Sequence, residues 1–347
     1  MASFTAMLLV TLVLGLLSVL LLVGVRIWSA PSRGKQLAKD LGLPRPAVIA
    51  HRGASYLAPE ATRPAYLLAR ELGADYLELD LQRTRDEVLI ALHDRDLLRT
   101  TNVREVFPER AKDPPEAFTF AELHKLDVGS WFNARFPERA RASFTGVSIL
   151  RLEEILDIAE DGSNRPGLFI EMKTPSRYPG IERQLVETLT ARGWIGNHRG
   201  RHRPKFIFAS FEPESLALLK ELAAEVPAVL LIDEVMMRKE GWDGLLRQAQ
   251  QLGVGIGTWG YRWARGPDWS VQHAPRRYVT TWPRYTGAAH RAGLLVYPWA
   301  IDARWEMWMA HLAGADGIFT NRPDIALAFY GRPAPKDLAT LWKTIGY

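Results

Sequence analysis

Short apolar runs that resemble β-strands alternate with longer amphipathic segments through most of this 347-residue chain. We expect strands at residues 47–51, 75–82, 87–93, 167–173, 205–210, 228–232, 293–299 and 316–320. Amphipathic segments of helical length lie between many of them, at residues 62–72, 152–159, 181–192, 213–225 and 302–312. Such alternation predicts an α/β fold with a parallel sheet, and about eight repeats suggest a closed (β/α)₈ TIM barrel. An open doubly wound sheet is the alternative, although no glycine-rich dinucleotide turn follows the first strand.

Two stretches interrupt this alternation. Residues 96–147, after the third expected strand, are rich in proline, charge and aromatic side chains, and residues 259–277 have the same character. A connection as long as the first is usually functional or locally folded, so we expect an insertion over one end of the barrel. The predicted domains are therefore a barrel at residues 46–332, with the insertion at 96–147, and a C-terminal tail at 333–347.

The N-terminal residues predict a membrane anchor. Residues 6–25 are 20 consecutive small or apolar residues, and the first 25 residues carry no charge. A helix rising ~1.5 Å per residue would cross a hydrocarbon core of ~30 Å over this length. We therefore expect one transmembrane helix within residues 1–30. A cleaved signal peptide is the alternative, although no basic residue precedes the apolar run.

A basic segment follows the apolar run, and residues 31–45 are expected to form a juxtamembrane linker. Residues 26–45 contain a single acid, Asp40, and the cations Arg26, Arg33, Lys35, Lys39 and Arg45. The positive-inside rule then predicts a single-pass membrane protein with its barrel on the cytoplasmic side. The formal charge of +5 suits anionic lipid better than nucleic acid, for which no recognition motif is present.

Three carboxylates near the ends of expected strands form a candidate metal site. Glu78 and Asp80 are two residues apart in one strand, so they project from the same face, and Glu171 holds a similar place in another strand. Parallel strands end at one rim of a barrel, where active sites lie. The chain has no cysteine, and carboxylates favour hard cations. We expect one divalent cation here, Mg²⁺ or Ca²⁺; salt bridges with neighbouring cations are the alternative.

Two histidines at strand ends are the candidate acid and base. His51 closes the first expected strand and His93 the third. Histidine takes or gives a proton near neutral pH, and a pair on opposite sides of a phosphorus supplies both functions. Arg52 offers a planar fork for a phosphate oxygen, and Lys173 a second positive charge. Together with the carboxylates, these groups are suited to metal-assisted chemistry on phosphate esters.

Two aromatic residues are candidates for a substrate pocket. Phe211 follows one expected strand, and Trp299 ends another beside the proposed site. Most of the twelve tryptophans occur from Trp242 onward. Such side chains can line a pocket for glycerol or an acyl chain, or rest at a membrane interface, but we expect most of them to serve ordinary packing.

The motifs together resemble those of the glycerophosphodiester phosphodiesterase family. They are HRG at residues 51–53 with PE at 59–60, E-x-D at 78–80, T-x-D at 84–86, HD at 93–94, E-x-K at 171–173 and GADGIFTNRP at 314–323. The resemblance covers about residues 48–330. The segment FTFAELHKLDVGSWF, residues 118–132, also resembles the insertion that follows the HD strand in that family.

The resemblance implies a barrel enzyme that hydrolyses glycerophosphodiesters to glycerol 3-phosphate and an alcohol. By matching position, it implies acid and base roles for His51 and His93, metal ligation by Glu78, Asp80 and Glu171, and phosphate contacts from Arg52 and Lys173. Asp94 and Glu60 are further candidates, as residues that support these groups. Ala61 stands where the family usually has asparagine, so Glu60 is either a ligand or an orienting group.

Two other functions remain compatible with the sequence. A lysophospholipase D would act on membrane lysophospholipids, for which an anchored barrel is well placed. An inactive barrel could serve as a membrane-tethered binding module, but all the core polar residues are present.

Overall fold

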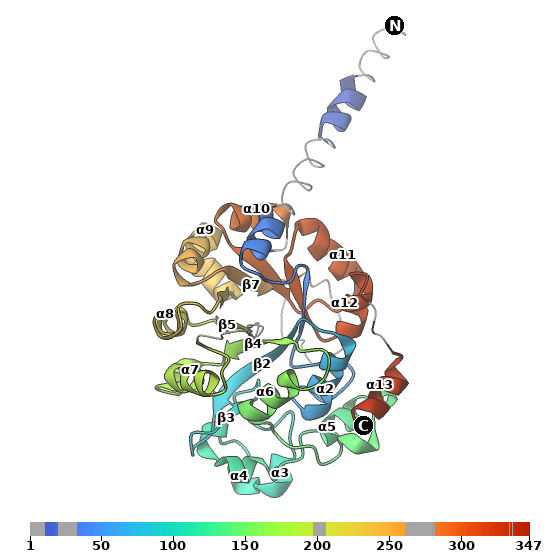
Figure 1. Ribbon diagram of the computed structural model, residues 1–347, viewed down its shortest axis with the longest axis vertical. Coiled ribbons are helices and arrows are strands. Elements are labelled where there is room, and N and C mark those ends of the chain that lie inside the picture. The colour runs from blue at the N-terminus through green and yellow to red at the C-terminus, as the bar shows by residue number, and fades with distance from the viewer. Residues whose placement is uncertain are drawn as a thin grey trace.

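Parallel strands form the wall of a barrel in the computed structural model, which describes residues 11–19, 33–196, 206–260, 280, 282–332, 334 and 336–347 (Figure 1). The strands that form this wall in the described part of the chain are β1 Ala47–Ala50, β2 Tyr76–Arg83, β4 Gly167–Met172, β5 Phe206–Ser210, β6 Ala228–Leu231, β7 Gly255–Trp259, β8 Leu295–Trp299 and β9 Gly317–Thr320. They pair in the order β8-β7-β6-β5-β4-β2-β1-β9. The Asp316 amide donates to the Val296 carbonyl at 2.9 Å, which brings the two end strands together. The predicted parallel barrel is confirmed.

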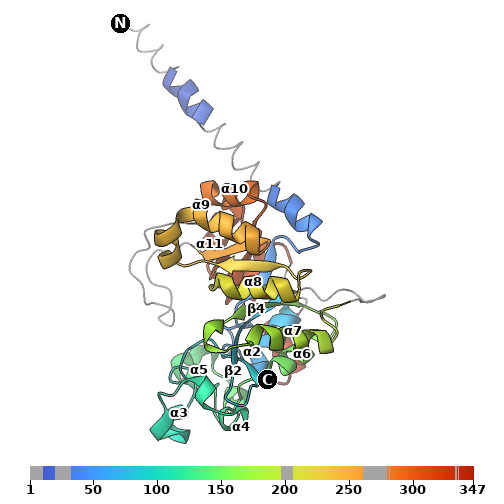
Figure 2. The same ribbon diagram turned by 90° about the vertical axis from the view of Figure 1, so that its left-hand side faces the viewer.

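Helices cover the outside of the barrel (Figures 1 and 2). They are α2 Arg63–Leu72, α6 Leu152–Glu160, α7 Ile181–Ala191, α8 Pro213–Leu222, α9 Glu234–Leu252, α10 Pro283–Arg291, α11 Arg304–Ala313, α12 Pro323–Phe329 and α13 Leu338–Thr344. Proline lies in the first turn of α2, α8, α10 and α12, where its missing N–H costs nothing. Gly73 and Gly314 end α2 and α11 in the left-handed conformation that glycine adopts readily.

One expected strand is not part of the barrel wall, and one barrel strand escaped prediction. β3, Leu89–Ala91, pairs antiparallel with β2 because the turn between them is too short for a crossover helix. β7 was missed because its glycines weaken the strand pattern. A Cβ on Gly255 would lie 2.9 Å from the Leu295 carbonyl oxygen, so close packing of neighbouring strands requires glycine there.

Residues 96–147 are locally folded beside β3. Their short helical elements are α3 Val103–Val106, η1 Pro108–Arg110, η2 Pro115–Ala117, α4 Phe120–Leu123, α5 Ser130–Arg135, η3 Pro137–Arg139 and η4 Ala142–Phe144. A small core that includes Leu97, Phe118 and Leu123 holds them against Ile90 of β3. A further turn, η5 Pro175–Arg177, follows β4. Most of the second irregular stretch, residues 259–277, lies outside the described residues.

The described N-terminal residues form two helical stretches. Residues 11–19 are helical and exposed, and the rest of the expected span at 6–25 lies outside the described residues. Within the described part, no helix has both the length and the apolar character needed to cross a membrane. Residues 33–40 are helical too, and Ala38 is buried against the barrel. Part of the segment expected to be a linker therefore packs on the barrel, as α13 does in the predicted tail, where Leu341 and Trp342 are buried.

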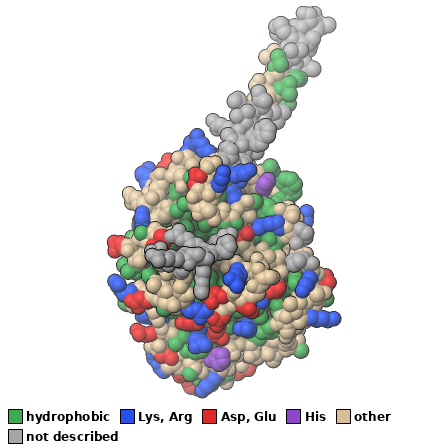
Figure 3. Space-filling model, in the orientation of Figure 1, with side chains coloured by type: hydrophobic (Ala, Val, Ile, Leu, Met, Phe, Trp, Pro, Cys, Tyr) green, Lys and Arg blue, Asp and Glu red, His purple; other side chains and the backbone are tan. Residues whose placement is uncertain are grey.

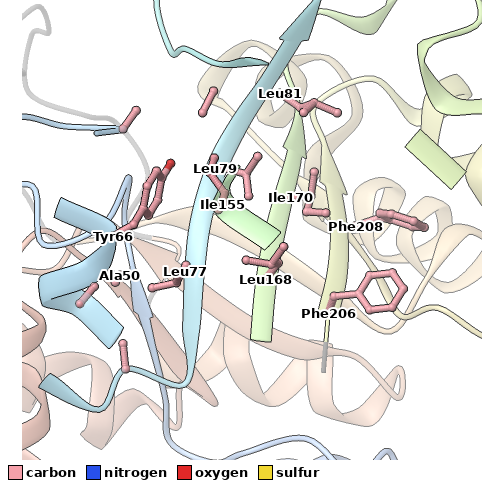
Figure 4. Packing of buried hydrophobic residues seen from close by; sticks show 14 of the residues in the cluster. Ala50, Tyr66, Leu77, Leu79, Leu81, Ile155, Leu168, Ile170, Phe206 and Phe208 are labelled. Carbon is pink, nitrogen blue, oxygen red and sulfur yellow. The ribbon is translucent and has the colours of Figure 1, made fainter. Parts of the chain in front are cut away.

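Alternation along β2 separates the site from the outer core. Leu77, Leu79 and Leu81 face outward and pack with side chains of the surrounding helices, among them Tyr66 and Ile155 (Figure 4). The intervening residues of a strand face the opposite way, so Glu78 and Asp80 point into the barrel. A one-residue slip in register would exchange leucines for carboxylates, which makes this pairing strongly specified.

Aromatic side chains fill the barrel beneath those carboxylates. Phe169 of β4 contacts the rings of Tyr76, Tyr297 and Phe319 at centroid distances of 6.1, 6.0 and 4.7 Å. Phe169 lies two residues before Glu171 and Tyr76 two before Glu78, so each ring lies on the same side of its strand as a carboxylate. This apolar layer forms the floor of the candidate site.

Candidate active site

Three carboxylates meet at the C-terminal rim of the barrel. Asp80 of β2 pairs directly with Glu171 of β4, and Glu78 lies one inward position below Asp80. One oxygen from each of the three side chains lies within 4.8 Å of the others. Glu78 and Asp80 are each 1% exposed, so these charges share a site almost closed to water. The convergence expected from strand geometry is present in the structure.

Two cations lie against this trio. Lys173 Nζ is 2.9 Å from Glu171 Oε1 and 3.2 Å from Asp80 Oδ1. Arg52 Nε is 3.1 Å from Asp80 Oδ2, and the backbone N–H of Arg52 donates a hydrogen bond to Glu78 Oε2 at 2.7 Å. The salt bridges considered as an alternative therefore exist, but they supply two positive charges for three carboxylates.

The charges of the two β2 carboxylates are strongly coupled. Burial, together with the neighbouring Asp80 and Glu171, raises the pKa of Glu78 well above its usual range. Burial alone would also raise the pKa of Asp80, but Lys173, His93 and Arg52 outweigh it and lower that pKa. A positive ion between the carboxylates would relieve their repulsion. Both Asp80 oxygens are buried and, apart from the ion pairs with Lys173 and Arg52, accept no hydrogen bond from the described residues, so the donor set fits one hard divalent cation.

His51 is held by a neutral amide. Its Nδ1 lies 2.8 Å from Asn321 Oδ1, while Asn321 donates through its amide nitrogen to Asp302 Oδ2 at 2.7 Å. Because Asp302 fixes the orientation of that amide, Nδ1 of His51 carries the proton, and the lone pair lies on Nε2. Burial and the adjacent Arg52 lower the pKa of His51 to about 3. The imidazole is therefore neutral at pH 7.

His93 is held by a carboxylate. Its Nδ1 lies 2.7 Å from Asp94 Oδ1, and Asp94 Oδ2 accepts from Arg99 Nε at 2.6 Å. The His93 side chain is 32% exposed, and His51 is likewise only partly buried. The two histidines thus differ in the charge of their partners. The expectation that Asp94 orients a neighbour is consistent with this contact.

Arg99 connects the two halves of the site and was not anticipated from the sequence. It donates to both oxygens of Glu60, at 2.8 and 2.7 Å, as well as to Asp94. Glu60 in turn accepts from Arg52 Nη1 at 2.9 Å. Glu60 is therefore placed to orient the two arginines, and it does not belong to the carboxylate trio. Arg99 lies in the insertion, where no periodic pattern marks it.

Asn321 was also missed as a partner of His51, although it lies within the closing motif that the sequence displays. Ser55 supports it, since its hydroxyl lies 2.8 Å from Asn321 Oδ1. The departure at Ala61 has a backbone correlate: Ala61 has φ 56°. Asparagine adopts that left-handed conformation more readily than alanine does.

The two predicted pocket aromatics lie side by side. The rings of Phe211 and Trp299 contact edge to face, with centroids 6.1 Å apart, and both pack on the apolar layer inside the barrel. Both are half-buried at the ends of β5 and β8, on the rim that carries the carboxylates. An apolar part of a ligand could contact this pair.

Comparisons with known proteins match this chain to one family of enzymes. The model of the glycerophosphoryl diester phosphodiesterase family matches residues 51–325. A glycerophosphodiester phosphodiesterase of Bacillus subtilis is 34% identical over 298 residues, which cover 86% of this chain and 89% of the relative. One from Caldanaerobacter subterraneus is 31% identical over 278 residues, 80% of this chain and 94% of the relative.

Solved structures show the same fold. An Oleispira antarctica phosphodiesterase, determined with the product sn-glycerol-3-phosphate, has a TM-score of 0.61 and 20% identity, and covers 83% of this chain and 97% of its own. A structure described as a putative glycerophosphoryl diester phosphodiesterase from Agrobacterium tumefaciens has a TM-score of 0.63 at 17% identity, with coverages of 83% and 98%. At these identities, the similarity establishes the fold alone.

Replacing Glu60 with glutamine should reduce stability in a pH-dependent way. Burial alone would raise the pKa of Glu60, but Arg52 and Arg99 outweigh it and lower that pKa to about 2. A carboxylate with a lowered pKa stabilises the fold above its unfolded pKa of ~4.3, and this contribution is lost as pH falls through the folded value. We expect Glu60→Gln to lower the free energy of unfolding at pH 7, by a difference that shrinks from about pH 5 toward 2.

Urea unfolding of both proteins across this pH range measures the effect. Glu240→Gln provides the control, because Glu240 is an exposed carboxylate of α9. A difference between wild type and Glu60→Gln that stays constant with pH would show that the Glu60 charge does not stabilise the fold.

Proposed function

The chain belongs to the glycerophosphoryl diester phosphodiesterase family, and from this premise we infer that it hydrolyses glycerophosphodiesters to glycerol 3-phosphate and an alcohol. The mechanism rests on the carboxylate trio of Glu78, Asp80 and Glu171. Two histidines lie close to Asp80: His51, which follows β1, and His93, which follows β3. This arrangement combines a cation site with two proton-transfer groups.

The trio would hold one divalent cation, Mg²⁺ or Ca²⁺, since all its donors are carboxylate oxygens. Bound there, the cation would act as a Lewis acid toward the phosphate and offset charge that builds up during displacement. Arg52 and Lys173 already face Asp80 and supply fixed positive charge at the same position. We expect both to contact phosphate oxygens, the arginine through its planar fork.

The environments of the histidines suggest their order of action. His51, neutral and with its Nε2 lone pair available, would accept the proton of the nucleophile, which is water or the neighbouring glycerol hydroxyl. The nucleophile attacks phosphorus and the bond to the alcohol oxygen breaks. If the glycerol hydroxyl is the nucleophile, water then opens the resulting cyclic phosphate to give glycerol 3-phosphate. His93, whose carboxylate partner can balance a positive charge, would give its proton to the departing alkoxide.

A lysophospholipid is a second candidate substrate. The Phe211 and Trp299 rings offer an apolar contact on the rim beside the carboxylates. A glycerophosphodiester with an acyl chain could place that chain on these rings, which would make the enzyme a lysophospholipase D. A purely water-soluble substrate has no need of such a surface.

The apolar run at residues 6–25 supports a location at a membrane. We expect it to anchor the chain as a single span, with the basic residues from Arg26 onward and the barrel on the cytoplasmic side. The barrel would then act on lipid or on soluble glycerophosphodiesters close to the inner surface of the membrane.

Removal of metal should abolish activity. We expect the full chain in detergent to lose hydrolysis of glycerophosphocholine with EDTA and to regain it with Mg²⁺ or Ca²⁺, because the cation offsets charge among the carboxylates. ³¹P NMR identifies glycerol 3-phosphate as the product, and a parallel assay with lysophosphatidylcholine distinguishes the two substrates. Inactivity on both with every cation would favour the binding-module alternative.

Changing the leaving group of the substrate should distinguish the roles of the two histidines. We expect His51→Ala and His93→Ala each to lower turnover of an alkyl phosphodiester by more than ~10²-fold. A p-nitrophenyl ester of glycerol 3-phosphate needs no proton on its leaving group, so it should restore much of the loss in His93→Ala but not in His51→Ala.

The control for this comparison is His124→Ala, since His124 is exposed within the insertion. It should behave as wild type on both esters. Equal losses on both esters in the His93 variant would contradict its role as acid, and restoration in the His51 variant would reverse the assignment.

The location can be tested by protease protection in membrane vesicles. We expect the barrel to be cleaved in inverted vesicles and protected in right-side-out vesicles, because the basic residues follow the apolar run. Cleavage from the outside only, or recovery of the chain in the soluble fraction after cell breakage, would contradict the anchor with this orientation.

A further inference from the structure

One face of α11 exposes large apolar side chains. Trp305, Trp308 and Leu312 are 48%, 53% and 44% exposed. Their spacing of three and four residues places them on the same side of the helix. Trp282, at the start of the neighbouring α10, is 51% exposed. Figure 3 shows hydrophobic side chains gathered over α11, at the upper right of the molecular body.

This aromatic face of α11, comprising Trp305, Trp308 and Leu312, rests on a firm base. The Trp308 ring packs edge to face on Phe329 of α12, with centroids 5.5 Å apart, and contacts His311. Met307 and Ala310, on the opposite side of α11, are fully buried. The helix is therefore fixed by its inner side, and half of each tryptophan remains available to a partner.

The helix at residues 33–40 adjoins the same part of the molecule. A Cβ on Gly34 would overlap the side chains of His290, in the last turn of α10, and Asp316. Arg45, just beyond this helix, lies close enough to His311 to affect it electrostatically. The helix at residues 33–40, which follows the apolar run in the sequence, therefore meets the barrel where α10 and α11 end.

Exposed charges around this face are mostly positive. The acids of α10, α11 and the helix at 33–40 are Glu306, which caps the start of α11, and Asp40. The exposed cations on these three described helices are Arg33, Lys35, Lys39, Arg284, Arg291 and Arg304. Tryptophan beside lysine and arginine suits the headgroup region of a membrane, and anionic lipids attract such clusters.

We propose that the aromatic face of α11 docks on a bilayer that contains anionic lipid. α11 begins shortly after β8, on the rim that carries the carboxylates, and runs toward the helix at 33–40. Contact along this face holds the barrel on its side, with the rim beside the lipid surface. The inference concerns binding alone and does not depend on the reaction.

The absence of native cysteine allows a direct test with single labels. Spin labels at Trp308→Cys and Leu312→Cys in the full chain are compared with one at Val235→Cys, an apolar residue of α9 that is 61% exposed. The chain is bound to phosphatidylcholine and phosphatidylglycerol vesicles. We expect collisions with O₂, relative to those with a water-soluble nickel complex, to be several-fold more frequent at 308 and 312 than at 235.

A second comparison tests the tryptophans themselves. With the label at 312, Trp305→Ser together with Trp308→Ser should return the label to water, whereas Val235→Ser should leave it in lipid. If the labels at 308 and 312 in bound chains show the collision frequencies of a label in water, the docking is overturned and the anchor is left intact. Failure of the chain to bind the vesicles would overturn it too.

Self-association is the remaining outcome. Spin–spin broadening at 308 that disappears on dilution with unlabelled chain would show that a second copy covers this face, and would also overturn the proposal. Because Leu312→Cys retains both tryptophans, its result stands even if a tryptophan variant folds poorly.

Discussion

Glu78 and Asp80 are two carboxyl groups buried on one strand, and the site is organised around the repulsion between their charged forms. The alternation of β2 turns both into the barrel, above a layer of aromatic side chains. Lys173 and Arg52 offset part of the charge, and the opposite shifts in the pKa of the two carboxylates show that the balance is incomplete. A bound cation would complete it, which explains how a barrel tolerates three acids in so small a volume.

Ion pairs extend this organisation from the barrel to the insertion. Arg52 contacts Asp80 on one side and Glu60 on the other, and Arg99 of the insertion joins Glu60 to Asp94, the partner of His93. A displacement of the insertion would therefore disturb the proposed acid, while His51 is held independently through Asn321 and Asp302. The different supports of the two histidines fit different tasks in proton transfer.

Much of this arrangement follows from the sequence because alternate side chains of a strand face the same way, and because the carboxyl ends of parallel strands lie on one rim of a barrel. That rule was enough to bring Glu78, Asp80 and Glu171 to one rim. It failed for β3, where chain direction depends on a short turn, and for β7, whose glycines respond to close packing. Arg99 contacts Glu60, which is 39 residues away in the sequence, and Asn321 is oriented by Asp302, which is 19 residues away. Local sequence patterns do not report such tertiary contacts.

Cation binding is the property on which the proposed chemistry depends most directly. Titration of the intact chain with Mn²⁺, followed by electron paramagnetic resonance, should show one ion bound per chain and displaced by Mg²⁺ or Ca²⁺. Asp80→Asn should abolish that binding, whereas Glu240→Gln should leave it unchanged. Equal binding by wild type and Asp80→Asn would contradict a cation site among Glu78, Asp80 and Glu171.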